Sequence, residues 1–100
     1  MPDFDLSKFV GFEWDKGNIE KNYQKHRVTP AEAEEIFLDE NLQVVKDIKH
    51  SQKEDRFIAL GKTFLGKILF AIFTLRGSKI RIISARLANK RERFHYEQKL

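Results

Sequence analysis

The stretch "KILFAIFTLRGSKIRIISAR", residues 67–86, contains the two strands around which the fold is expected to form. Its first half is apolar on both faces except near its ends, which is typical of a strand in the centre of a sheet. The segment at residues 76–79 predicts a hairpin turn around Gly77, and the second half, rich in isoleucine, returns antiparallel. Residues 67–86 therefore predict the central hairpin of an antiparallel sheet.

Three further segments show the period-two alternation of strands. The segment "FVGFEWD" at 9–15 predicts a short half-buried strand near the N-terminus. The segments "LQVVKDI" at 42–48 and "RFIALGK" at 56–62 predict two more strands, with a polar turn at 50–55 between them. These strands are expected to extend the hairpin into a larger antiparallel sheet.

Helix-capping signals mark the remaining elements. Asp15 is a natural cap for a helix that runs to about His26. A second helix begins at Thr29, with a proline next and Glu32 completing a capping box, and ends near residues 38–41. Asn89, three residues before a glutamate, begins a C-terminal helix that weakens toward the end of the chain. The predicted fold is a single α+β domain over residues 1–100, in the order β-α-α-β-β-β-β-α.

Composition limits what kind of protein this is. One hundred residues with 41% hydrophobic content, nine Phe and one Trp are enough for one buried core. The chain has no Cys, so a disulfide framework, a thiolate metal site and a thiol nucleophile are excluded. The longest apolar run, residues 68–73, is far shorter than the roughly 20 residues that span a bilayer. The N-terminus also lacks the order of a signal peptide, so we expect a soluble cytoplasmic protein without membrane association.

Positive charge is concentrated in the last quarter of the chain. Residues 76–100 contain eight Lys or Arg and two Glu, a net charge of +6, whereas the first 75 residues carry 11 basic and 13 acidic side chains. This asymmetry indicates a polyanionic partner such as RNA, DNA or an acidic protein. A solvated basic surface without a partner is the plain alternative.

Two of these basic residues, Arg81 and Arg86, stand in a strand next to isoleucines. In a regular strand they point to opposite faces, because their positions differ by five, an odd number. A β-bulge near Ser84 would re-aim one of them. The sequence leaves both arrangements open, and the two arginines are the strongest candidates for binding phosphate, because arginine pairs with two phosphate oxygens at once.

No pattern for a metal or a cofactor is found, and none is expected. His26, His50 and His95 are far apart in sequence, and no glycine-rich phosphate loop or nucleophile elbow is present. The available Arg, Lys, His, Glu and Tyr side chains suit metal-free RNA cleavage. In that reaction the 2′-hydroxyl attacks the adjacent phosphate, a base and an acid move protons, and cations stabilise the charged transition state.

Each candidate also has a structural explanation. His26 closes a helix face with Ile19 and Tyr23 and is suited to a partly buried position. His50 lies in a turn, where solvent exposure is as plausible as catalysis. Glu54 and Arg56 are close enough in sequence to form a surface ion pair.

Two later residues also allow both a functional and a structural interpretation. Arg76 ends the central strand and is explained equally well as a flank of the hairpin. Tyr96 is suited either to stacking on a base or to packing against the sheet, and packing is the favoured interpretation.

Seven segments together resemble the BrnT family of type II toxin–antitoxin toxins, which is similar in fold to the RelE ribonucleases. They cover residues 12–97 in the family's order and spacing. They are "FEWD" at 12–15, "NYQKH" at 22–26, "EAEEIFLD" at 32–39, "HSQKEDRFIALG" at 50–61, "FTLRG" at 73–77, "IRIISAR" at 80–86 and "KRERFHYE" at 90–97.

The resemblance implies a ribonuclease that halts translation by cutting RNA without a metal. It implies candidate catalytic residues for proton transfer (His26, His50, Glu54) and for holding phosphate (Arg81, Arg86). It also implies candidate RNA-contacting residues, namely Lys25, Arg56, Arg76, Arg93 and Tyr96.

The same resemblance implies a partner: a BrnA-type antitoxin that masks the toxin in a heterotetramer and binds operator DNA through a ribbon-helix-helix domain. One departure from the family stands out, because Arg27 occupies a position where the family usually has Gly. If this position has a positive φ, Arg costs about 1 kcal/mol or more there. The alternative hypotheses for the function of this chain are a non-enzymatic basic binding module and an inactive toxin homologue.

Overall fold

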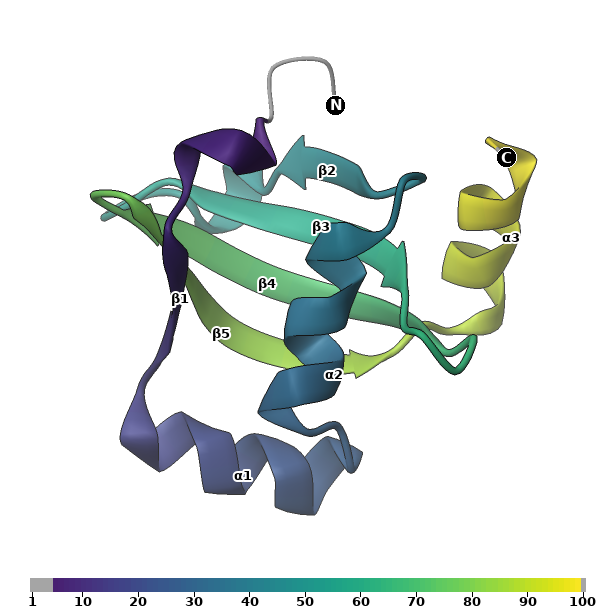
Figure 1. Cartoon of the computed structure of the whole chain (residues 1–100), viewed down its shortest axis with the longest axis horizontal. Coiled ribbons are helices and arrows are strands. Elements are labelled where there is room, and N and C mark those ends of the chain that lie inside the picture. The colour runs from purple at the N-terminus through teal and green to yellow at the C-terminus, as the bar shows by residue number, and fades with distance from the viewer. Residues whose placement is uncertain (1–4, 100) are drawn as a thin grey trace.

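The structure, a computed structural model, describes residues 5–99 and has one five-stranded sheet in the order β1-β5-β4-β3-β2 (Figure 1). The strands are β1 (Gly11–Trp14), β2 (Gln43–Lys46), β3 (Arg56–Lys62), β4 (Ile68–Arg76) and β5 (Lys79–Leu87). The helices are α1 (Lys16–His26), α2 (Pro30–Glu35) and α3 (Lys90–Gln98). Three short 3-10 turns complete the chain: η1 (Leu6–Lys8), η2 (Ile36–Leu38) and η3 (Ile48–His50).

The predicted α+β class, order of elements and central strand are confirmed, since β4 is the third of the five strands. Strands β2 to β5 are antiparallel, as predicted. Strand β1 differs, because it joins the far edge of β5 in parallel, so the sheet is mixed. Local sequence patterns contain no information on the direction in which strands distant in sequence pair.

The predicted helix starts are also confirmed. The Asp15 carboxylate accepts the Gly17 backbone N–H at 2.9 Å at the start of α1. Complete capping boxes begin α2 and α3, each with a glutamate at the third helical position. Helix α3 ends at Gln98, and the predicted weakening toward Leu100 falls partly outside the described residues.

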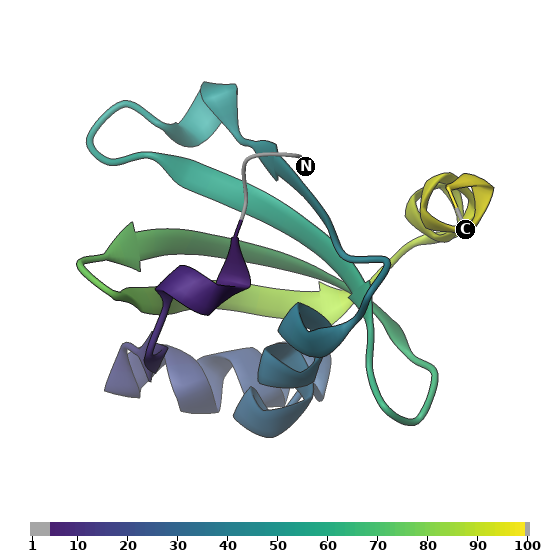
Figure 2. The same ribbon diagram turned by 45° about the horizontal axis from the view of Figure 1, so that its top comes forward.

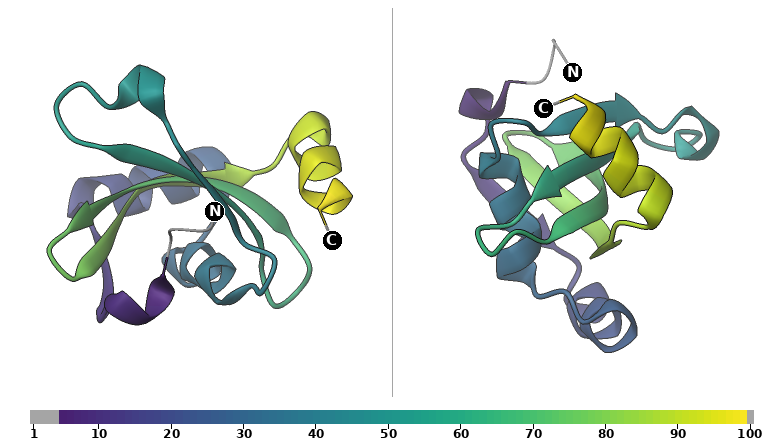
Figure 3. Two further views of the ribbon diagram at one scale, coloured as in Figure 1. Left: turned by 90° about the horizontal axis from the view of Figure 1, so that it is seen from above. Right: turned by 90° about the vertical axis from the view of Figure 1, so that its right-hand side faces the viewer.

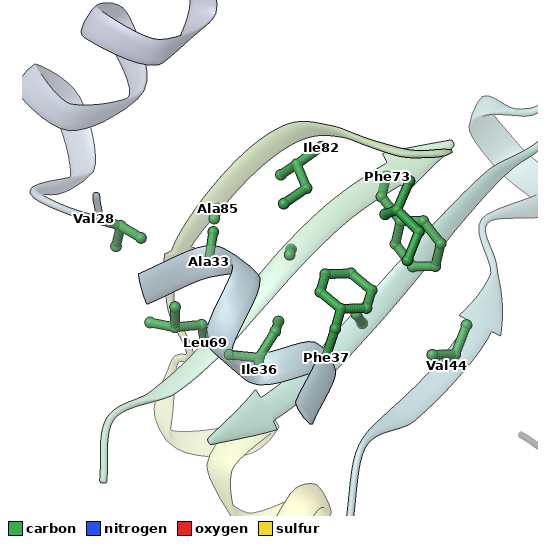
Figure 4. Close-up of a cluster of buried hydrophobic side chains, with 12 residues drawn as sticks. Val28, Ala33, Ile36, Phe37, Val44, Leu69, Phe73, Ile82 and Ala85 are labelled. Carbon is green, nitrogen blue, oxygen red and sulfur yellow. The ribbon is translucent and has the colours of Figure 1, made fainter. Parts of the chain in front are cut away.

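Helix α2 and η2 cover one face of the sheet and form the main core there (Figure 4). The Phe37 ring packs edge-on against Phe73 at 5.1 Å between centroids and lies 5.5 Å from Phe12. Gly61 allows η2 to approach β3 closely, because a Cβ there would lie 2.7 Å from the Ile36 Cβ. Burial on this face is complete for Ile36 and Phe73, which are 0% exposed.

Helix α3 lies on the opposite side of the sheet from α2 (Figure 3). It covers only one end of that second face, where Tyr96 packs with Leu60 and Ile68. Figure 2 shows α2 on one side of the strands and η3 on the other, while α1 follows the edge of the sheet beside β5. We call the part of the second face that α3 leaves uncovered the open face. Its side chains come from β3, β4 and β5 and are Arg56, Ile58, Phe70, Ile72, Thr74, Arg81, Ile83, Ser84 and Arg86.

Candidate functional site

A β-bulge in β5 decides where the two strand arginines point. The pairing of β4 with β5 runs from Ile72 opposite Ser84 to Phe73 opposite Ile82, so Ile83 is an extra residue. This bulge reverses the alternation between Arg81 and Arg86 and brings both onto the open face. Of the two arrangements that the sequence left open, the bulged one is observed.

A row of polar side chains crosses the sheet on the open face. Arg56 on β3 is opposite Thr74 on β4, which is opposite Arg81 on β5, which is opposite Glu13 on β1. Adjacent strands are about 5 Å apart, so the two arginines flank Thr74 at close range. The Thr74 hydroxyl donates to the Asp55 carbonyl at 2.7 Å and thereby links this row to the loop before β3.

The two predicted phosphate-binding arginines form internal ion pairs. Arg81 lies 3.3 Å from a Glu13 carboxylate oxygen and 3.5 Å from Asp15. Arg86 binds Glu92 with two hydrogen bonds of 2.8 and 2.9 Å, and its guanidinium stacks 4.1 Å from the centre of the Phe70 ring. Arg86 therefore fastens the start of α3 to the sheet, while Arg81 keeps a partly exposed position beside Thr74.

The loop between β2 and β3 positions a histidine and an arginine together. The His50 Nδ1 atom lies 2.9 Å from a carboxylate oxygen of Asp47, which is mostly buried. The Ser51 hydroxyl donates to the Asp47 carbonyl at 2.6 Å and accepts the Arg56 N–H at 3.0 Å. These bonds hold the loop closed, so that the second ring nitrogen of His50 is free to face solvent. Within residues 5–99, the Arg56 guanidinium forms no ion pair.

Helix α1, which lies beside β5, brings a second histidine, His26, to the edge of the open face. The buried Asn22 amide donates to the Ala85 carbonyl at 2.9 Å and accepts the Ala85 N–H at 3.0 Å, beyond the point where β1 ends. This pairing fixes α1 along β5 and presents Lys25 and His26 beside Ser84. Burial, together with the nearby Lys25 and Arg86 charges, lowers the pKa of His26 below its usual range. The lowered pKa favours the neutral form of the His26 ring.

Two depressions on the open face share a wall made by Ile83 and Ser84. One, of about 360 Å³, is lined by Asp47, His50 and Arg56 together with apolar side chains of the sheet. The other, of about 300 Å³, is lined by α1 and includes His26. We call the two together the sheet groove. It has a histidine at each end and cations on both sides, which is an arrangement suited to a phosphodiester chain with two proton carriers.

A scan against protein families matches residues 14–92 to the ribonuclease toxin BrnT of type II toxin–antitoxin systems. This match covers more than half of the chain. The chain belongs to the BrnT family. The crystal structure of the Brucella abortus ribonuclease toxin BrnT is similar to this chain, with a TM-score of 0.63 and 26% sequence identity over 81% of this chain and 99% of that one. A comparison with curated proteins finds no match.

Membership of the BrnT family places this chain among ribonuclease toxins and implies an antitoxin partner. The further relation to the RelE ribonucleases stays a prediction. In the part of the chain that the structure describes, no group of three His, Asp or Glu is arranged to hold a metal ion. No helix among residues 5–99 is long and apolar enough to cross a membrane.

The position where the BrnT family usually has Gly keeps the left-handed conformation here. Arg27 has φ 59° and ψ 30°, and its N–H donates to the Tyr23 carbonyl at 2.7 Å to end α1. Its guanidinium lies 5.6 Å from the centre of the Tyr23 ring. The helix therefore ends as a glycine-capped helix would, and His26 keeps its place in the sheet groove despite the substitution.

Other predicted site residues lie outside the sheet groove. Glu54 pairs with Arg76 at 3.5 Å, rather than with its sequence neighbour Arg56. Glu54 also lines a larger depression of about 690 Å³, together with His50 and Arg56. Arg93 lies on α3, where its guanidinium donates to the Ala88 carbonyl at 2.8 Å.

The structure corrects the expectation that Tyr96 contacts RNA. Its side chain is 1% exposed and packs in the cluster between α3 and the sheet, so its ring is not available to stack on a base. The Tyr96 hydroxyl donates to the Asp39 carboxylate. Packing against the sheet, the interpretation that the sequence favoured, is the observed role.

Asp47 and Asn22 contribute to the site and were not predicted. Asp47 is three residues before His50, and one turn of 3-10 helix brings the two side chains together. An Asp-x-x-His pattern is a usable signal once such a turn is assumed. Asn22 has no comparable signal, because its partner Ala85 is 63 residues away in sequence.

Proposed function

We propose that this chain is an endoribonuclease toxin that cuts RNA in the sheet groove without a metal ion. The supporting observation is the placement of His50, Arg56 and His26 around two depressions that share Ile83 and Ser84. This arrangement brings a cation and two proton carriers to one stretch of RNA backbone. The three residues also match positions implied by the resemblance to the BrnT family.

The proposed reaction breaks one bond and forms one. His26, whose lowered pKa favours the neutral form of its ring, accepts the 2′-hydroxyl proton. The 2′-oxygen then attacks the adjacent phosphorus. His50 donates a proton to the leaving 5′-oxygen as the P–O5′ bond breaks. The products are a 2′,3′-cyclic phosphate and a 5′-hydroxyl, and no oxidant or metal is required.

Two further residues support this chemistry. Arg56 has no internal ion-pair partner among residues 5–99. Its guanidinium group can therefore bind the phosphate oxygens on which charge develops. Asp47 orients the His50 ring through Nδ1 and is proposed as a positioning residue.

Arg81 assists from the neighbouring strand if RNA displaces Glu13 or Asp15. Glu54 is proposed to assist from the neighbouring depression, and Lys25, Arg76 and Arg93 are proposed to attract the RNA backbone.

The antitoxin is proposed to be of the BrnA type, to bind DNA through a ribbon-helix-helix domain and to form a heterotetramer with the toxin. The support is membership of the BrnT family. Expression of this chain alone should arrest growth, and co-expression with the product of a neighbouring gene should restore it. Sedimentation of the co-purified complex tests the two-plus-two stoichiometry.

The chain offers a matched set of variants, because it has three histidines and one of them lies outside the sheet groove. Purified wild type, His50→Ala, His26→Ala and His95→Ala are incubated with a long single-stranded RNA in EDTA. Wild type and the exposed His95 variant should cut equally. The other two should cut about 10² to 10⁴ times more slowly.

The chemical ends of the fragments test the route. Cyclic phosphate and 5′-hydroxyl ends are expected, and 5′-phosphate ends would rule out attack by the 2′-hydroxyl. Full activity in His50→Ala would show that RNA is not cut in the sheet groove. Binding of RNA without any cutting by the wild type would favour the non-enzymatic binding module instead.

A further inference from the structure

Apolar side chains line the middle of the otherwise basic open face. Ile58 and Ile72 are opposite each other on β3 and β4, and Ile83 is the bulged residue of β5. All three are partly exposed, and none of them belongs to either hydrophobic cluster of the described residues. Stability of the core does not account for three exposed isoleucines in a row across the sheet.

These isoleucines form the floor of the 360 Å³ depression beside His50. Phe70 closes the floor toward α3, with the Arg86 guanidinium lying over its ring. The rim is polar and consists of Asp47, His50, Arg56 and Ser84. An apolar floor within a charged rim is typical of a site for a ligand that has an apolar face and an anionic group.

An unpaired nucleotide of RNA has both features. Its phosphate suits Arg56 at the rim, and its base has a flat, weakly hydrated face that gains free energy on contact with apolar surface. Double-stranded RNA does not fit in the same way, because its bases are stacked inside the helix and only phosphates and riboses meet the protein. Charge alone would favour either form, so the apolar floor is the feature that discriminates between them.

We propose that Ile58, Ile72 and Ile83 form a nucleobase subsite that holds one unpaired base next to the bond to be cut. This inference rests on the proposed function for the location of the cut, and it goes further in assigning the substrate as RNA with an unstacked base. The Ser84 hydroxyl, which makes no hydrogen bond within residues 5–99, stands at the shared wall and can donate to or accept from the edge of that base.

Binding to RNA analogues that cannot be cut separates the subsite from catalysis. The probe is a fluorescent single-stranded oligonucleotide with fluorine in place of every 2′-hydroxyl. It is compared with its duplex and with an abasic oligomer of equal length and charge. The single strand should bind roughly tenfold more tightly than the abasic oligomer. Equal affinity of the two single strands would overturn the subsite, as would tighter binding of the duplex.

Two threonine variants give a matched pair. Ile72→Thr places a hydroxyl in the floor, whereas Val45→Thr changes a β-branched residue at the β2 edge that is 57% exposed and does not line the depression. Ile72→Thr should lose the preference for bases and keep its affinity for the abasic oligomer, and Val45→Thr should resemble the wild type. If Ile72→Thr fails to fold by circular dichroism, Ile58→Thr takes its place.

The outcomes distinguish the two proposals. Preference for bases without cleavage of natural RNA would keep the subsite and contradict the proposed function. Cleavage of natural RNA by a protein that binds the abasic oligomer equally well would keep the proposed function and contradict the subsite.

Discussion

The two faces of the sheet are built from alternate residues of the same strands, and they differ in almost every physical property. On the face covered by α2, Ala71, Phe73 and Ile82 are 0% exposed and in contact with the aromatic cluster around Phe37 (Figure 4). On the open face, Ile72 is partly exposed and Arg81 carries a charge. Strands with a period of two can therefore stabilise the domain with one set of side chains and bind a ligand with the other.

The difference also shows how stability and function are separated in a small domain. The covered face contains the buried apolar area from which most of the folding free energy comes. The open face contains ion pairs and partly exposed isoleucines that contribute less to stability. The bulge at Ile83 is the feature that keeps this division intact, because it places both strand arginines on the open face.

The largest expected change in the free energy of unfolding comes from substitutions at adjacent residues on β4 that point to opposite faces. Phe73→Ala should lower the free energy of unfolding by about 3–5 kcal/mol, because it opens a cavity next to Phe37 and Phe57. Ile72→Ala should lower it by about 1 kcal/mol, since its side chain is already partly exposed. Urea titrations followed by circular dichroism measure both. Equal losses would contradict the division between the two faces.

An intermediate effect is expected for the ion pair that fastens α3 over one end of the open face. Arg86→Ala removes two hydrogen bonds to Glu92 and should lower the free energy of unfolding by about 1–3 kcal/mol at pH 7. Arg86→Lys should restore only part of this, because lysine cannot bind the carboxylate with two parallel bonds.

The effect of Arg86→Ala should also depend on pH. Burial alone would raise the pKa of Glu92, but hydrogen bonds from Arg86 and from the Asn89 N–H lower it below its usual range. The stabilisation from this pair is therefore present above pH 4.5 and is lost as the pH falls through the lower native-state pKa. The difference between wild type and Arg86→Ala should shrink in acid, and a constant difference would show that the pair is not responsible.

A smaller change in the free energy of unfolding, an increase, is expected for a substitution at the end of α1. Arg27→Gly relieves a left-handed backbone and should raise the free energy of unfolding by about 1 kcal/mol. Arg27→Ala is the control, because alanine keeps the strain and loses only the contact with the Tyr23 ring. A glycine variant no more stable than the alanine variant would show that the strain is relieved in some other way. RNA cleavage should be unchanged in both variants, since His26 does not move.

The smallest effect is the pH dependence contributed by His26. Its native-state pKa lies below the unfolded value of about 6.5 because of burial, Lys25 and Arg86. The native state therefore resists protonation, so the free energy of unfolding should fall as the pH drops below about 6.5 and level off below the native-state pKa. Comparison of wild type with His26→Gln between pH 5 and 8 measures this contribution. Parallel curves would show that His26 is not perturbed in the folded protein.

Local signals were sufficient to predict most of the fold. The capping residues Asp15, Thr29 and Asn89 each begin a helix, and alternation of apolar residues marks the strands. The parallel pairing of β1 with β5 could not be predicted in this way, because it depends on how segments 68 residues apart meet. The bulge at Ile83 was one of two possibilities and is decided by packing on the covered face.

The candidate site was less accessible to prediction than the fold. Histidines and arginines could be identified by their chemistry, but whether each one is paired depends on partners that are distant in sequence, as for Arg81 with Glu13. The pairing of Arg86 with Glu92 could not be foreseen either, because Glu92 already had a role in the capping box of α3. Arg56, for which the sequence suggested a surface ion pair with Glu54, forms no ion pair within residues 5–99 and is proposed to bind RNA phosphate.

RNA is proposed to bind the open face between His50 and His26. The most direct test is a titration of the ¹⁵N-labelled protein with the 2′-fluoro single strand, followed by amide chemical shifts. We expect the largest chemical-shift changes at Arg56, Ile72 and Ser84, with further changes at His26 on α1. Changes centred instead on the exposed apolar residues Leu38 and Phe64, or on Phe94 of α3, would contradict it.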